Sequence, residues 1–141
     1  MNNTQNIIID DGLKHFKLSN NEGEVFAELA FNPADTSIIE RYDSVVDAFN
    51  EIKLKGDTPE ERKAFIQAVS NKFKEQFDYL LNRDNSDALF KVYSPVTVFG
   101  NGDFFAEVLL RQTAKIIEQE YNVRLQKRAK RIEKYTKKYR K

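Results

Sequence analysis

From Asp103 to its last residue, Lys141, the chain contains neither glycine nor proline. Because these two residues break helices most strongly, a helix that begins here has nothing to end it. At a rise of 1.5 Å per residue it would be about 58 Å long, which exceeds the diameter of a small domain. The sequence therefore predicts a final helix that is capped by Asp103 and projects beyond the folded body.

The far end of this helix is strongly basic. Residues 124–141 hold ten of the 23 lysines and arginines but only one acid, Glu133, which gives a charge of about +9. Residues 1–123 hold the other 13 basic residues and 21 acids, or about −8, so the near-neutral total of +1 hides a dipolar chain. Such an end can bind a nucleic acid, an acidic protein or the acidic body of a second copy.

Within the basic end, Leu125, Ile132 and Tyr139 recur every seven residues. This thin apolar seam is typical of a helix that rests on another protein. We therefore expect the segment to bind a partner through its basic and tyrosine side chains: Arg124, Lys127, Arg128, Lys130, Arg131, Lys134, Tyr135, Lys138 and Tyr139.

Nucleic acid is the alternative partner for this segment. Its lysines and arginines would bind phosphates, and its tyrosines would stack on unpaired bases. The negative charge of residues 1–123 would repel a polyanion, however, and the chain has neither a helix-turn-helix nor an RNA-binding sheet signature. A membrane surface fits less well, because the apolar side of the segment is thin. Protein docking is the preferred hypothesis.

The beginning of the chain has the alternation of β-strands. Residues 16–18 and 25–31 alternate around a polar turn at 19–23, which predicts a β-hairpin with Val25, Ala27, Leu29 and Phe31 on one face. Before it, Ile7-Ile8-Ile9 and Asp10-Asp11-Gly12 predict either a third strand or a hydrophobic arm. Two strands alone are marginal and need a helix over their apolar face.

The apolar spacing then changes to steps of three and four. From Ile38 to Ile52 it predicts a helix that is capped by Asp35 or Thr36 and ended by Gly56.

Thr58-Pro59-Glu60-Glu61 has the order of a capping box and predicts a second helix, which ends near residues 82–85. Residues 86–102 predict a short helix and a connecting loop.

These elements predict an α+β fold that is mainly helical, with an N-terminal hairpin of two or three strands packed on a helical core. We expect one globular domain over residues 1–123 and a basic helical extension over 124–141. The expected core comprises Phe31, Ile39, Tyr42, Val46, Phe49, Phe65, Val69, Phe73, Phe77, Phe105 and Leu109.

Few residues could carry chemistry. The chain has no cysteine and a single histidine, His15, which leaves no catalytic triad and little for a transition metal. The acidic turn at 84–87 has Leu89 and Pro95 where a calcium loop needs glycine and glutamate. Residues 99–103 contain two glycines but no phosphate-loop spacing. We expect no catalytic residue, cofactor, metal or membrane span, and a cytoplasmic protein that is not an enzyme.

The order of these elements has a counterpart in a known family. Its segments are the hairpin at 16–26 leading to 31–35, the helix at 38–52, Val98-Phe99-Gly100 followed by 104–109, and the closing residues 130–139. In this layout the chain resembles the tail assembly chaperones of long-tailed, siphovirus-type bacteriophages and prophages of Gram-positive hosts. The layout covers most of the chain beyond residue 14 and contains no catalytic motif.

The resemblance implies a protein that coats the long, helical tape measure protein and brings tail tube subunits to it during tail assembly. It also implies self-association into rings or spirals, action in the bacterial host cytoplasm and absence from the mature virion. An acidic body and a basic helix suit this role, because head-to-tail contacts that do not close produce an open spiral.

Overall fold

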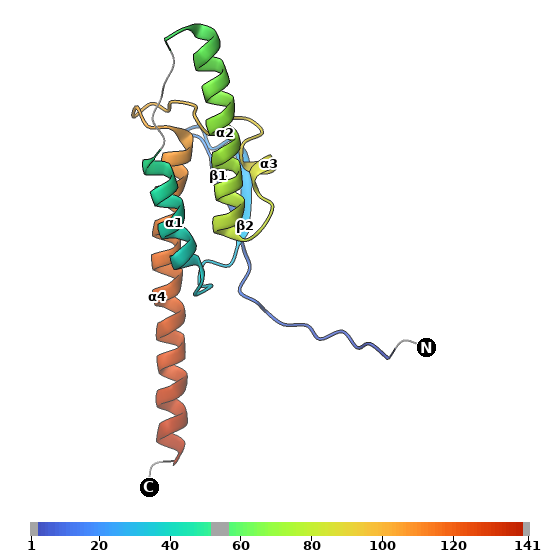
Figure 1. Cartoon of the computed structure of the whole chain (residues 1–141). Coiled ribbons are helices and arrows are strands. Elements are labelled where there is room, and N and C mark those ends of the chain that lie inside the picture. Colours follow the sequence, from blue (N-terminus) through green and yellow to red (C-terminus); the bar gives the residue numbers. More distant parts are fainter. Residues whose placement is uncertain (1–2, 52–56, 140–141) are drawn as a thin grey trace.

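The computed structural model describes residues 3–51 and 57–139, with side chains up to Arg131. A two-stranded antiparallel sheet is followed by helices, the last of which runs well past the body (Figure 1). The elements are β1 (Lys14–Ser19), β2 (Val25–Phe31), α1 (Ile38–Asn50), α2 (Pro59–Leu81), α3 (Ser86–Leu89) and α4 (Phe105–Tyr139). The predicted α+β fold with a long last helix is confirmed.

The hairpin contains a bulge that the alternation did not predict. Phe16 pairs with Leu29, but the register shifts after Leu18, so that Ser19 pairs with Val25. Such a bulge adds one residue to a strand and turns its side chain. The ring of Phe26 consequently packs 5.9 Å from that of Phe105. Val25 is exposed, so its predicted place on the buried face is wrong.

Residues 3–13 form no strand, so the prediction of a third strand is wrong and the alternative, a hydrophobic arm, holds. This segment leaves the body as an extended trace (Figure 1). Ile7, Ile8 and Ile9 are 79%, 90% and 76% exposed.

Helix α1 begins at Ile38, as expected, but its cap is not the predicted one. Its N-cap is Ser37, so neither Asp35 nor Thr36 caps it. Asp35 instead accepts a hydrogen bond from the Ser37 amide and forms a 3.0 Å ion pair with Arg41. The hydrogen bond from Arg41 lowers the pKa of Asp35. The predicted end of the helix, at Ile52 with Gly56 as its stop, lies outside the described residues.

Helix α2 confirms its predicted start and end. The Glu61 amide donates to Thr58 Oγ1 over 3.1 Å, and Pro59 is the first helical residue. The helix ends at Leu81 because Asn82 adopts a left-handed conformation, with φ of 53°. Both features follow common helix-end patterns.

The short helix α3 is also confirmed, whereas the expected cap of α4 is not. Helix α4 begins at Phe105, so Phe104 and not Asp103 occupies the N-cap position. The Asp103 carboxylate lies further out and pairs with Arg111. The Phe104 amide donates instead to the Glu107 side chain over 3.2 Å.

The core joins one face of the hairpin to α1, α2, α3 and the first half of α4. Aromatic rings connect these elements; Phe49 and Phe73, for example, lie 4.3 Å apart. Ile39 was expected in the core but is 50% exposed, because α1 turns Ile38 and Val45 inward instead. The remaining expected core residues are buried or pack half-buried against the core: Phe31, Tyr42, Val46, Phe49, Phe65, Val69, Phe73, Phe77, Phe105 and Leu109.

Candidate partner-binding surfaces

Helix α4 is held by the body over its first half and leaves it in its second half. Leu109, Thr113 and Ile117 are buried, and Thr113 satisfies its hydroxyl by donating to the Leu109 carbonyl over 2.8 Å. Tyr121 and Arg124 are half-buried, and every described side chain from Leu125 to Arg131 is exposed. The second half of the helix therefore runs away from the body (Figure 1).

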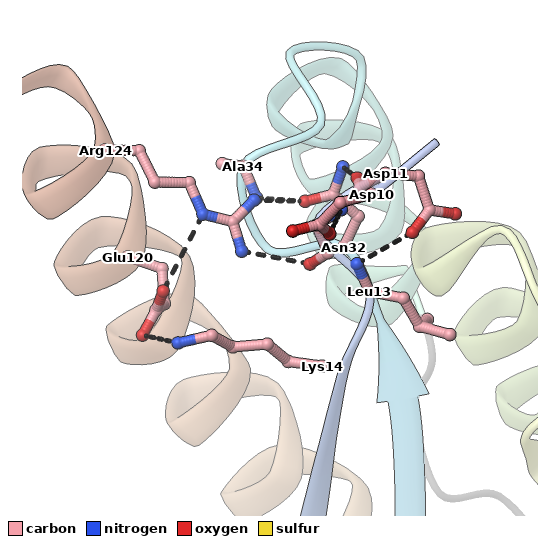
Figure 2. Close-up of polar contacts among 9 residues, drawn as sticks. Asp10, Asp11, Leu13, Lys14, Asn32, Ala34, Glu120 and Arg124 are labelled. Carbon is pink, nitrogen blue, oxygen red and sulfur yellow. Dashed lines mark hydrogen bonds and ion pairs between the residues drawn. The ribbon is translucent and has the colours of Figure 1, made fainter. Parts of the chain in front are cut away.

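Among the described side chains of α4, Arg124 is the last one that forms hydrogen bonds with the body (Figure 2). Its Nη1 donates to Asn32 Oδ1 over 2.7 Å, and its Nη2 donates to the Gly12 carbonyl over 3.0 Å. Asn32 Nδ2 in turn donates to the Asp11 carbonyl over 2.7 Å. We call this group, Asp11, Gly12, Asn32 and Arg124, the arm junction, because it joins the start of β1 and the end of β2 to α4.

An ion pair reinforces the arm junction. Lys14 Nζ lies 2.7 Å from Glu120 Oε1, and Arg124 Nε lies 3.8 Å from Glu120 Oε2. The hydrogen bond from Lys14, more than the nearby charges, lowers the pKa of Glu120. Arg124 was expected to bind a partner, but the structure engages it within the chain. The exposed basic surface accordingly begins at Lys127.

This exposed surface, which we call the basic segment, consists of Lys127, Arg128, Lys130 and Arg131. Two apolar side chains, Val123 and Leu125, are about half exposed just before it. The other expected binding residues continue the same helix, since its backbone extends to Tyr139.

The side chains of Lys134, Tyr135, Lys138 and Tyr139 lie outside the described part of the chain, as does that of Ile132 from the apolar seam.

Beside the N-terminal half of α4 the structure forms an apolar groove of about 800 Å³, which the sequence did not predict. Consecutive residues of β1 and its turn, 16–21, line one side, and α4 lines the other with Val108, Gln112 and Ile116. The loop at 97–100 also lines the groove. The apolar residues were visible in the sequence, but the gap between them arises only when the elements pack.

The lining of the groove is mostly apolar. Lys17 and Tyr93 are the titratable side chains among its lining residues, and they do not form a paired acid and base. Across the described residues, no cluster of three histidine or acidic side chains could hold a metal ion. Nor does any helix in that part of the chain combine the length and apolar character needed to cross a membrane.

Comparison with protein-family models, with curated proteins and with solved structures finds no match to this chain.

Proposed function

We propose that this chain is a non-catalytic assembly chaperone of phage tails, which binds other protein chains through its basic segment. One observation carries the proposal. Helix α4 continues past the hydrogen bonds that Arg124 makes with the body, and the described side chains beyond Leu125 are exposed and mostly basic. Because these described side chains are solvated, they add little packing to the fold.

The charge of the chain indicates which surfaces the basic segment fits. Its own residues 1–123 carry about −8, so another copy of this body is one complementary partner. A long acidic helix is another. Its charge would complement the basic segment, and its apolar side chains could pack on the half-exposed Val123 and Leu125.

The layout described under Sequence analysis supports the more specific proposal. On that ground we propose the tape measure protein and tail tube subunits as partners, a ring or spiral of copies, and action in the bacterial host cytoplasm before the virion is complete.

The test is co-expression with the tape measure and tail tube proteins encoded by the same phage or prophage, followed by light scattering on a sizing column. A variant in which Lys127, Arg128, Lys130 and Arg131 are all changed to Glu should lose the complex. The control changes the same number of exposed charges elsewhere: Arg62, Lys63, Lys72 and Lys91 to Glu. Both variants have the same net charge, so a difference between them reports the position of the charges.

Retention of the complex by the basic-segment variant, or no complex with the wild-type chain, would overturn the proposal. Raised salt should also weaken the complex, since charges on an exposed helix are screened.

The four exposed cations also favour a second candidate, a single-stranded nucleic acid. Its signature is binding to an oligonucleotide with an affinity that falls linearly with salt on a log–log scale. Binding of this kind by the wild-type chain and the control, without binding to the tail proteins, would replace the first proposal with the second.

A further inference from the structure

The N-terminal arm, residues 3–9, ends in three consecutive isoleucines, Ile7, Ile8 and Ile9. All three side chains are at least three-quarters exposed. Single exposed apolar side chains are common on proteins, but contiguous ones indicate an interaction site. Isoleucine is also β-branched and favours an extended backbone. The arm is therefore suited to bind as a strand.

The two outer edges of the sheet differ. On the outer edge of β2, Asn85 pairs with Ala30: its Oδ1 accepts from the Ala30 amide over 2.9 Å and its Nδ2 donates to the Ala30 carbonyl over 3.0 Å. Among the described residues, β1 pairs only with β2, which leaves its other edge open. Open strand edges are common sites for the addition of a strand from another chain.

The apolar groove lies beside this strand, because consecutive β1 residues from Phe16 to Ser19 line it. At about 30 Å³ per water molecule, its volume of about 800 Å³ would hold on the order of 25 waters. These waters would lie against Phe16, Phe26 and Phe99, which offer them no strong hydrogen bonds. Replacing them with isoleucine side chains is favourable, because it removes apolar surface from water.

The arm and strand β1 are also similar in length. β1 has six residues, and the arm from position 3 to position 9 has seven. At roughly 3.3 Å per residue both span about 20 Å when extended. The arm can therefore run along the whole of β1.

The arm junction directs each arm away from its own body. The Gly12 amide donates to Asp10 Oδ1 and the Leu13 amide to Asp11 Oδ1, both over 3.0 Å. Arg124 binds the Gly12 carbonyl from the other side. With residues 10–13 held in this way, the arm runs away from the body (Figure 1). The groove of a second copy is the site that such an arm can reach.

We infer that the isoleucine arm of one copy binds along β1 in the apolar groove of a second copy, so that copies associate by arm exchange. The basic segment takes no part in this contact, and the inference does not depend on the proposed function. The contact is apolar, so it should persist at 1 M salt, where the Debye length is only about 3 Å.

The test measures mass by light scattering at 1 M salt over a range of concentrations. The wild-type chain should form oligomers. An arm variant, with Ile7, Ile8 and Ile9 all changed to Asn, and a groove variant, Val98→Asp, should each be monomeric. Val98 lines the groove and is 61% exposed, so its substitution leaves the core intact. The matched controls are Val92→Asp and Ile39→Asn, which change exposed side chains outside the groove and should keep the wild-type mass.

Mixing the two variants gives the decisive result. The arm variant retains a groove and the groove variant retains an arm, so an equimolar mixture should form a heterodimer that neither forms alone. A monomeric wild-type chain, an oligomer that survives both substitutions, or a mixture that stays monomeric would each overturn the inference. None of these outcomes involves a tail protein, so they test the contact between copies separately from the binding of tail proteins, which the co-expression assay measures.

Discussion

At the scale of single residues, Arg124 connects parts of the chain that are far apart in sequence. Its guanidinium joins Gly12, just before β1, and Asn32, just after β2, to α4. The sequence placed Arg124 with the other basic residues of the C-terminal end, because a charge pattern carries no information on which cation folds back. Only the path of the chain after β2 brings Asn32 within reach.

Gly12 is the residue at which this junction can be tested. It has φ of +82°, and a Cβ atom there would collide with Arg124 and lie 3.1 Å from Asn32 Oδ1. Gly23 has nearly the same φ, +81°, but open space around it. Both substitutions by alanine incur the left-handed backbone cost, about 1–2 kcal/mol. Gly12→Ala should lower the free energy of unfolding by roughly a further 1.5–3 kcal/mol, through lost hydrogen bonds to a charged group.

Urea denaturation of the two variants measures this difference. Equal destabilisation by Gly12→Ala and Gly23→Ala would show that the arm junction contributes nothing to stability.

Glu120 gives the junction a dependence on pH. Its pKa is lowered in the folded chain, chiefly by the hydrogen bond from Lys14. A lowered pKa adds stability above the ordinary glutamate value of about 4.3, and this stability is lost as the pH falls through the folded pKa. Glu120→Gln should therefore be less stable than the wild-type chain at pH 7, by roughly 0.2–1 kcal/mol for a partly exposed pair. The two should converge in acid.

Urea titrations at a series of pH values check this, with Glu118→Gln, an exposed position on the same helix, as the control. A difference between Glu120→Gln and wild type that grows toward acid would have the wrong sign and contradict the assignment.

At the scale of elements, the helix ends differ in how they are capped. Thr58 caps α2 with its side chain, whereas Ser37, at the same position of α1, makes no side-chain cap bond. The capping sequence at Thr58 was recognisable because the bond is local, three residues apart. The cap of α1 was placed wrongly because Asp35 instead pairs with Arg41, which in turn donates to the Leu80 carbonyl on α2.

Changing the cap residue to alanine should therefore affect the stability of the chain differently at the two helices. Thr58→Ala should cost about 1 kcal/mol of stability, because it leaves the Glu61 amide without its partner. Ser37→Ala should change stability by less than about 0.5 kcal/mol, as is usual for exposed positions. Thermal or urea unfolding of both variants provides the measurement, and equal losses would contradict the capping described for the two helices.

At the scale of the whole molecule, the structure separates a packed body from two projecting parts, the N-terminal arm and the end of α4 (Figure 1). The arm junction lies where both leave the body, so it sets the direction of each. Any partner that binds the basic segment therefore lies beyond the arm junction.

This division predicts the effect of truncation. A chain that ends at Gln126 retains Arg124 and the arm junction but lacks the basic segment. Because the described side chains beyond Arg124 are exposed, its free energy of unfolding should stay within about 0.5 kcal/mol of the full chain. It should also fail to bind the partners of the basic segment. Calorimetry and the co-expression assay test the two parts, and a large loss of stability would mean that the removed helix packs on its own body.

The sequence by itself determined the type and order of the elements, the capped start of α2, the long final helix and the charge at its end. These properties depend on local signals, namely the apolar period, helix breakers and capping side chains a few residues apart. The hairpin bulge that turns Phe26 inward, the rotation of α1 that exposes Ile39, the arm junction and the apolar groove were decided only by tertiary structure. Each depends on which distant surfaces pack together, and residues such as Gly12 and Arg124, 112 positions apart, carry no local sign that they will meet.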